Sequence, residues 1–236
     1  IGGVKEKVNI DYALSFLSSF FLSQTPLLYS ITASLSLESV DSFQKILSLI
    51  LCIVVLLLIV LMTLKKKLHV TRPFLMVCCL SSVLIGLYLL TLLFYPSVPR
   101  SYYSYFLTLC SSCVPSVVLG AILAEASDSL SPFIKGIDIV SWIVSVATLV
   151  VLLTTDLSTT VNELNRAGLN YQQFSYYAVY AYSLNLFFVL NKNNVISQRK
   201  KKRAVRILMA VINVICALSG GGRGALVLLF VVSFYY

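Results

Sequence analysis

Long apolar runs alternate with short polar segments along this chain. Ile46 to Leu64 and Phe74 to Tyr95 carry no charge and are long enough to cross a bilayer core, which takes about 20 residues of helix. Tyr105 to Ala124 is a third run, in which Pro115 lacks a backbone N–H and predicts a kink. The runs lack the two-residue alternation of a barrel strand, so we expect helices. With the weaker runs included, the pattern predicts about eight transmembrane segments at 12–32, 46–64, 74–95, 105–124, 137–155, 174–190, 205–218 and 225–236.

Composition supports a membrane protein. Hydrophobic residues make up 58% of the 236 and charged residues 11%, whereas soluble domains carry about a quarter charged residues. We therefore expect an all-α, polytopic integral membrane protein in which residues 1–236 form a single membrane domain. Because the chain starts at Ile1 instead of a methionine and the last predicted span stops at Tyr236 after twelve residues, we also expect it to be a fragment of a longer chain.

Lysine and arginine predict which side of the membrane each segment occupies. With the amino terminus inside, the inner segments hold fourteen of the 18 basic residues, and the outer segments hold Lys45, Arg100, Arg166 and Arg223. The positive-inside rule therefore accounts for the net charge of +9. It also assigns the basic cluster 199–206 to topology and contact with anionic lipid, and we expect no nucleic-acid partner.

The cysteines and charged residues form no recognisable metal site. All six cysteines fall inside predicted spans, where they are expected to pack as small apolar residues. Cys110 and Cys113 have a C-x-x-C spacing, but neither a second pair nor a histidine is near in the sequence. The sequence also lacks a Ser-His-Asp set and a Walker loop, so we expect no metal and no cofactor.

A glycine-rich segment at 219–225 interrupts the apolar pattern. The preceding run, Ile207 to Leu218, has twelve residues, or about 18 Å of helix, so the chain is expected to turn or re-enter before crossing about 30 Å of bilayer. The Arg223 charge and the freed glycine N–H groups would need partners at that depth. If a helix starts after the break, its N-terminus completes a cradle for a phosphate or carboxylate. The alternative is an external turn whose arginine extends to the membrane surface.

The predicted outer loop 156–173 is the second polar region on that face. Its end carries a guanidinium, amides and an aromatic ring, which are groups that hold sugars and phosphates. These residues are Arg166, Asn170, Tyr171, Gln172 and Gln173. The alternative is a solvated loop, and we interpret the following Tyr176 and Tyr177 as part of an interfacial aromatic belt. Glu163 lies three residues before Arg166 and is expected to pair with it instead of acting as a base.

The order of these features resembles the bacterial O-antigen ligase and polysaccharide polymerase superfamily. The chain has many spans, the loop sequence NRAGLNY at 165–171, a further span, a basic inner loop, and then SGGGRGAL at 219–226. The last motif is similar to the family's serine/glycine-arginine-glycine-alanine-leucine signature. The resemblance covers Tyr103 to Tyr236.

The resemblance implies a metal-independent glycosyltransferase, a multi-pass protein of the bacterial cytoplasmic membrane. It would polymerise or ligate undecaprenyl-diphosphate-linked oligosaccharide units of O-antigen, capsule or exopolysaccharide at the outer face, with membrane lipid and other polysaccharide-assembly proteins as partners. Arg223 and Arg166 would engage the diphosphate as catalytic residues. The expected substrate-binding residues beside them are Gly221, Gly222, Gly224, Asn170, Tyr171 and Gln173.

Several alternatives stay open at this point. The family usually has a large outer loop after this last span, which in ligases carries a histidine, and the present sequence ends before it, so polymerase versus ligase and the general base are undetermined. A transporter or flippase for an anionic or lipid-linked sugar also uses broken helices, but it predicts a second glycine-broken span, which the sequence lacks. A non-catalytic assembly component would use Arg166 and Arg223 as ordinary turn residues.

Overall fold

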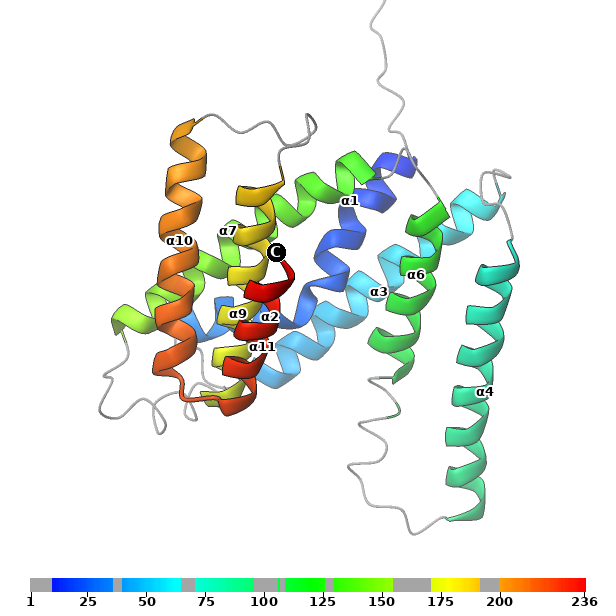
Figure 1. Ribbon diagram of the computed structural model, residues 1–236. Helices are drawn as coiled ribbons and strands as arrows, with labels where there is room; N and C mark the ends of the chain where they lie inside the picture. Colours follow the sequence, from blue (N-terminus) through cyan, green and yellow to red (C-terminus); the bar gives the residue numbers. More distant parts are fainter. Residues whose placement is uncertain are drawn as a thin grey trace, which may run out of the picture. The chain divides into compact units, whose positions relative to one another are not determined.

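Helices make up the described part of the chain in a computed structural model of the protein (Figure 1). The structure describes residues 10–35, 40–64, 71–95, 106, 109–125, 130–154, 171–191 and 200–236. No β-strand occurs within these ranges. The prediction of an all-α protein is therefore confirmed for the part of the chain that the structure describes.

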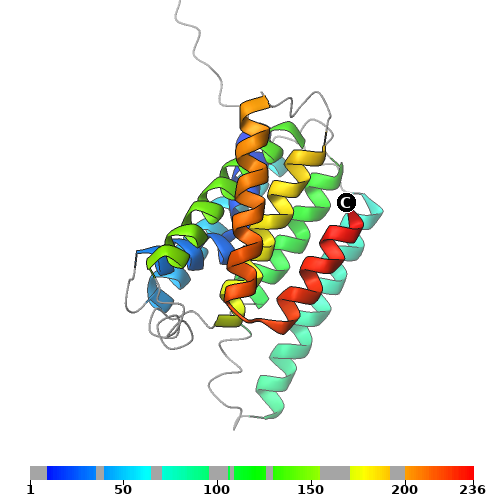
Figure 2. The same cartoon turned by 60° about the vertical axis from the view of Figure 1, so that its left-hand side comes forward.

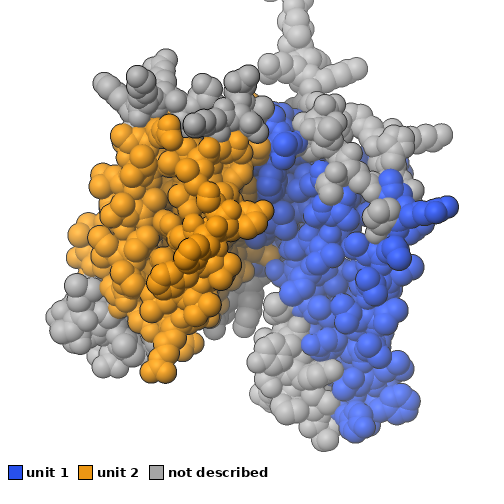
Figure 3. All heavy atoms as spheres, in the orientation of Figure 1, with its two compact units in different colours: residues 1–22, 46–133 blue, residues 23–45, 134–236 orange. Residues whose placement is uncertain are grey.

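The chain divides into two compact units, coloured separately in Figure 3. Unit 1 consists of residues 1–22 and 46–133, and unit 2 consists of residues 23–45 and 134–236. Each unit has its own buried apolar cluster. That residues 1–236 act as one membrane domain stays a prediction.

Unit 1 is built around three helices that meet through apolar side chains. Its elements are α1 (Ile10–Leu22), most of α3 (Val40–Leu64), α4 (Arg72–Phe94), the π-helix η1 (Leu109–Cys113) and α6 (Val114–Glu125). Leu14 and Phe21 of α1, Val55 of α3 and Leu119 of α6 are buried together in this core. Helix α4 contacts α6 and packs Phe74 against this core, but most of its own surface is exposed.

Unit 2 is centred on α9. Its elements are α2 (Gln24–Ser34), most of α7 (Leu130–Thr154), α9 (Tyr171–Leu190), α10 (Lys200–Ser219) and α11 (Arg223–Tyr235). Helix α9 packs most extensively against α10 and also contacts α11 and α2. It runs antiparallel to α10 and parallel to α11 (Figures 1 and 2).

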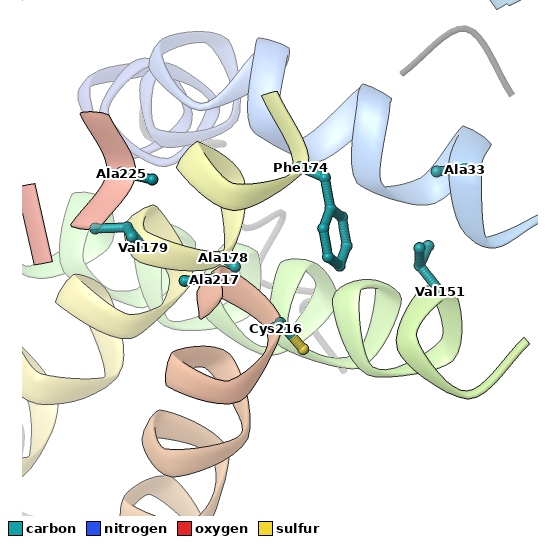
Figure 4. Packing of buried hydrophobic residues seen from close by; sticks show 8 residues of the cluster. All are labelled: Ala33, Val151, Phe174, Ala178, Val179, Cys216, Ala217 and Ala225. Atoms are coloured by element: carbon teal, nitrogen blue, oxygen red, sulfur yellow. The ribbon is translucent and has the colours of Figure 1, made fainter. Parts of the chain in front are cut away.

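Small side chains let the helices of unit 2 approach one another closely. Figure 4 shows the buried cluster, in which the Phe174 ring of α9 points towards Val151 of α7 and Ala33 of α2. The other members are Ala178, Val179, Cys216, Ala217 and Ala225. Because four of the eight residues are alanine, close helix packing of the kind common in membranes becomes possible.

Three helices within the described ranges are long and apolar enough to cross a membrane: Ile46–Leu64, Phe74–Phe94 and Leu130–Thr154. Shorter apolar helices lie at Tyr12–Leu22, Leu109–Leu123 and Arg223–Tyr235. Exposed apolar side chains at the end of α4, such as Leu93 and Phe94, are about three-quarters accessible, as expected of a lipid-facing surface. The chain thus has the helices of a membrane protein, whereas eight spans are not confirmed.

Two of the predicted spans contain an irregularity in the structure. Segment 12–32 is interrupted at Ser23, where α1 ends and α2 begins and where the Ser23 hydroxyl forms a 2.6 Å hydrogen bond with the Tyr180 hydroxyl. In segment 105–124, the π-helical turn at Leu109–Cys113 directly precedes Pro115. Because α6 continues from the π-helical turn without a break, Pro115 lies inside one helical segment, and its missing N–H accounts for the irregular turn that precedes it.

The predicted span 205–218 is longer in the structure. Helix α10 has 20 residues from Lys200 to Ser219, which corresponds to about 30 Å. The helix before the glycine turn is therefore longer than the twelve-residue apolar run, and that the chain turns within the membrane stays a prediction. The helix continues through the basic residues because lysine and arginine are good helix formers and because Arg206 is buried within the unit.

Candidate functional site

Three glycines connect α10 to α11. The Gly220 N–H donates to the Cys216 carbonyl at 3.2 Å and the Gly221 N–H donates to the Leu218 carbonyl at 3.1 Å, which closes the last turn of α10. Gly221 has φ +68°, a left-handed conformation that glycine adopts without strain. Gly222 has an extended backbone and caps the N-terminus of α11. The turn is therefore a tight, hydrogen-bonded structure.

The third glycine is held by α9. The Gly222 N–H donates to Ser175 Oγ at 3.2 Å, and both residues are buried. A Cβ placed on Gly222 would lie 2.9 Å from the Ser175 Cβ, which is closer than side chains tolerate. The N–H groups of Gly220, Gly221 and Gly222 are thus all used inside the protein. The freed glycine N–H groups for which an anion was expected are therefore already paired in the turn, and the predicted cradle depends on Arg223 and the start of α11.

A pocket of about 430 Å³ lies at this turn. It is lined by Gln172 and Tyr176 from α9 and by Gly221, Gly222, Arg223 and Gly224 from the turn and the start of α11. The Arg223 side chain belongs to the first residue of α11 and is exposed. The glycine turn thus forms one wall of a pocket and places a guanidinium at it.

The N-termini of two helices meet at the pocket. Helices α9 and α11 run parallel and both begin at this end of unit 2, as Figure 2 shows for α11 beside the first turn of α9. The first N–H groups of α11 have no intrahelical partner, and each helix dipole has its positive end here. Neither helix has an acidic residue in its first turn. Together with Arg223, this arrangement favours the binding of an anion.

Tyr176 borders the pocket from α9. A Cβ on Gly224 would overlap the Tyr176 hydroxyl, so this glycine makes room for the phenol beside the first turn of α11. Tyr176 lines the pocket, and its membership of an interfacial aromatic belt stays a prediction. The sequence does carry a signal for this position, because Tyr176 follows Gln172 by four residues and therefore shares its helix face.

Tyr177 has a different environment from its neighbour. Its ring stacks on Tyr29 of α2 with centroids 5.8 Å apart, and it packs against the buried cluster of unit 2. The adjacent tyrosines therefore point to different surroundings, one at the pocket and one at the core.

The structure brings together part of the predicted site. The residues Gly221, Gly222, Arg223 and Gly224 all line the pocket. Gln173 is exposed in the first turn of α9 but its neighbour Gln172 lines the pocket in its place. Tyr171 begins α9, but the structure does not describe its side chain. Arg166 and Asn170 lie outside the described residues. The second predicted catalytic arginine therefore has no described position.

The described residues contain no group of three or more His, Cys, Asp or Glu side chains arranged to hold a metal ion. All six cysteines are free thiols, including Cys110 and Cys113 in the C-x-x-C spacing. Comparisons of the chain with protein-family models, with curated proteins and with solved structures give no match. The functional argument therefore rests on the pocket and on the sequence motif that forms it.

Proposed function

We propose that the protein is a membrane glycosyltransferase that polymerises or ligates oligosaccharide units carried on undecaprenyl diphosphate. The observation that carries the proposal is the pocket at which Arg223 and the N-termini of α9 and α11 meet. A diphosphate matches such a site because it carries two adjacent negative charges. The resemblance of 219–226 to the polymerase and ligase signature supports the same assignment.

The charge arrangement suits the chemistry of this transfer. A hydroxyl of the acceptor sugar attacks the anomeric carbon, the bond from that carbon to the phosphate oxygen breaks, and the hydroxyl proton passes to a general base. The lipid diphosphate leaves with increased negative charge. Arg223 and the N–H groups at the start of α11 stabilise this charge as it develops, without a nucleotide or a metal.

The remaining lining residues suit the sugar. Gln172 and Tyr176 provide an amide and a phenol at the same pocket, and such groups contact sugar hydroxyls. The positive-inside distribution of lysine and arginine supports an assignment of this end of unit 2 to the outer face of the bacterial cytoplasmic membrane. We propose that the reaction takes place there.

The test is the length profile of the surface polysaccharide in a host deleted for the full-length gene. The host is complemented with wild type, Arg223→Ala, Arg223→Lys or Arg203→Ala at matched membrane levels. Arg203 is the control, because it is an exposed arginine of α10 that does not line the pocket. Wild type and Arg203→Ala are expected to restore long chains, while Arg223→Ala slows transfer by about a hundredfold to a thousandfold and leaves single lipid-linked units or unattached glycan.

Arg223→Lys is expected to retain part of the activity, because an ammonium keeps the charge but loses the planar donor fork. Identical glycan profiles for all variants would refute the proposal and favour a non-catalytic assembly role. If Arg223→Ala instead traps lipid-linked units at the inner face, a transporter or flippase is the better account.

A further inference from the structure

Polar side chains form a line inside unit 2, between α7, α9 and α10. Asp138, Ser141, Ser145 and Thr148 recur on α7 at spacings of three, four and three residues, so they share one helix face. Helix α10 contributes Arg206 and Asn213, seven residues apart, and α9 contributes Asn185. Apart from Asp138, all of these residues are buried. Such a line is unusual in an apolar bundle and therefore requires a physical account.

The first layer of this line is centred on Arg206, which is fully buried. Its Nη1 donates to Ser141 Oγ at 3.0 Å and to Asn185 Oδ1 at 3.0 Å. Its Nη2 donates to Asp138 Oδ1 in an ion pair. One guanidinium on α10 is thus bonded to both neighbouring helices. Its position in the basic cluster 199–206 suggests a solvated side chain at the membrane surface, but Arg206 is buried.

Aromatic rings enclose the same guanidinium. The Arg206 Cζ lies 4.8 Å from the centroid of the Trp142 ring of α7 and 4.3 Å from that of the Phe188 ring of α9. Both distances are within the range of cation–π attraction. The hydrogen bonds, the ion pair and the two rings that stabilise the Arg206 charge all lie at a single level of α7 and α9.

The second layer continues the hydrogen bonds without a gap. Ser145 Oγ accepts from Asn185 Nδ2 at 2.8 Å and from Asn213 Nδ2 at 3.0 Å. Asn213 Oδ1 accepts in turn from Thr148 Oγ1 at 3.0 Å. Because Asn185 bonds to both layers, the seven side chains form one connected network across three helices. We call it the polar network.

Apolar packing by itself specifies the register of membrane helices weakly, because lipid tails are as apolar as leucine. The polar network is sensitive to register. A slide of α10 by one turn, about 5.4 Å, would separate Arg206 from Asp138, Ser141 and Asn185 and leave a buried charge unpaired. A polar group at a buried helix interface is known to fix register even where it adds little stability.

We propose that the polar network sets the register of α10 against α7 and α9 and so places the glycine turn and Arg223 at the pocket. Arg206 is then a positioning residue, which acts over about 20 Å of helix on the turn that follows Ser219. The register itself is independent of any activity. Its effect on transfer rests on the proposed function.

The test measures register directly, with a pair of introduced cysteines. Ser175→Cys and Gly222→Cys place two thiols at the contact between α9 and the turn, where the Cβ atoms would be 2.9 Å apart, so the two backbones must separate slightly to reach the disulfide range of about 3.5–4.5 Å. A second pair, Ser175→Cys with Ser219→Cys, reports a shift of α10 by about one turn. Both pairs are made in the full chain with its six cysteines replaced by alanine, in native membranes. Disulfide yield after mild oxidation is measured by mass spectrometry.

Each pair is combined with Asp138→Leu/Arg206→Met, which removes both charges together and leaves no buried charge unpaired. Arg203→Met on the same helix is the control, since Arg203 is exposed. In the parent and the control, we expect a high yield for 175–222 and a low yield for 175–219. In the double variant, we expect the 175–222 yield to fall about tenfold and the 175–219 yield to rise.

A second variant, Thr148→Val/Asn213→Leu, removes part of the second layer without touching any charge and is expected to shift the two yields in the same direction by less. Unchanged yields in the variants that fold would overturn the proposal. The glycan profile of the same variants in the cysteine-containing chain separates the two proposals. A changed register with normal glycan refutes the role of Arg223 in transfer and leaves the role of the polar network intact.

Discussion

Arg206 and Asp138 form an ion pair in which the two side chains are very unequally exposed, at 1% and 35% respectively. The guanidinium lies inside unit 2, while the carboxylate extends to its surface. Replacing Asp138 therefore leaves a buried cation, whereas replacing Arg206 leaves a carboxylate that reaches solvent.

Asp138→Asn is expected to lower the free energy of unfolding more than Arg206→Met. Removing the acid leaves a buried cation without its counter-charge, which costs about 3–5 kcal/mol. Removing the arginine leaves a carboxylate that reaches solvent, so the loss is smaller. Denaturant unfolding in detergent micelles measures both, with the exposed Lys202→Met as control. Equal losses for the two variants would contradict the asymmetric burial.

Gly222→Ala is expected to destabilise the turn, because the new Cβ would lie 2.9 Å from the Ser175 Cβ. Overpacking of this kind costs about 1–3 kcal/mol. Ser175→Gly removes the atoms that clash, so the double variant Gly222→Ala/Ser175→Gly is expected to recover part of the loss in thermal stability. If the second change deepens the loss instead, the close contact is not the cause.

Gly221→Ala is expected to cost about 1–2 kcal/mol, since its φ of +68° places a Cβ in the left-handed region. Gly221→Asn is expected to cost less, because asparagine tolerates that conformation. Gly86→Ala is the control, as it lies within α4 with nothing within 4 Å of its Cβ position. Melting in detergent should show the loss at residue 221, while a comparable loss at residue 86 would argue against backbone strain.

Phe174→Ala and Phe234→Ala test the core of unit 2 with the same chemical change. Phe174 is 3% exposed in the buried cluster, whereas Phe234 near the end of α11 is 87% exposed. Truncating the buried ring is expected to cost about 3–5 kcal/mol, and truncating the exposed ring very little. Thermal unfolding in detergent distinguishes them, and the packing in Figure 4 would be wrong if Phe174→Ala had no effect.

The helices and the glycine turn follow from local sequence. Uninterrupted apolar runs such as Ile46 to Leu64 satisfy the length and backbone requirements of a membrane helix. Gly221 and Arg223 stand out because an apolar run tolerates neither a left-handed turn nor a charge without a local reason. These features depend on residues close together in the chain.

The features that the sequence did not predict depend on partners far away in the chain. Arg206 resembles its basic neighbours in composition, and its burial is decided by Asp138, 68 residues earlier. The break at Ser23 involves Tyr180, 157 residues later. A usable signal for the polar network was present, because an acid at 138 and an asparagine at 213 both lie in or beside apolar runs. These two residues indicate a buried polar site, but the sequence does not show which side chains they contact.

The charged start of α10 also has a consequence for the way the protein enters the membrane. Four consecutive basic residues, Lys200 to Arg203, and then Arg206 open this helix, and charged residues oppose the insertion of an isolated helix into a membrane. Helix α7, which carries Asp138 and is apolar enough to insert by itself, is synthesised first. We therefore expect α10 to integrate together with its completed neighbours, so that the order of the helices along the chain becomes part of the folding pathway.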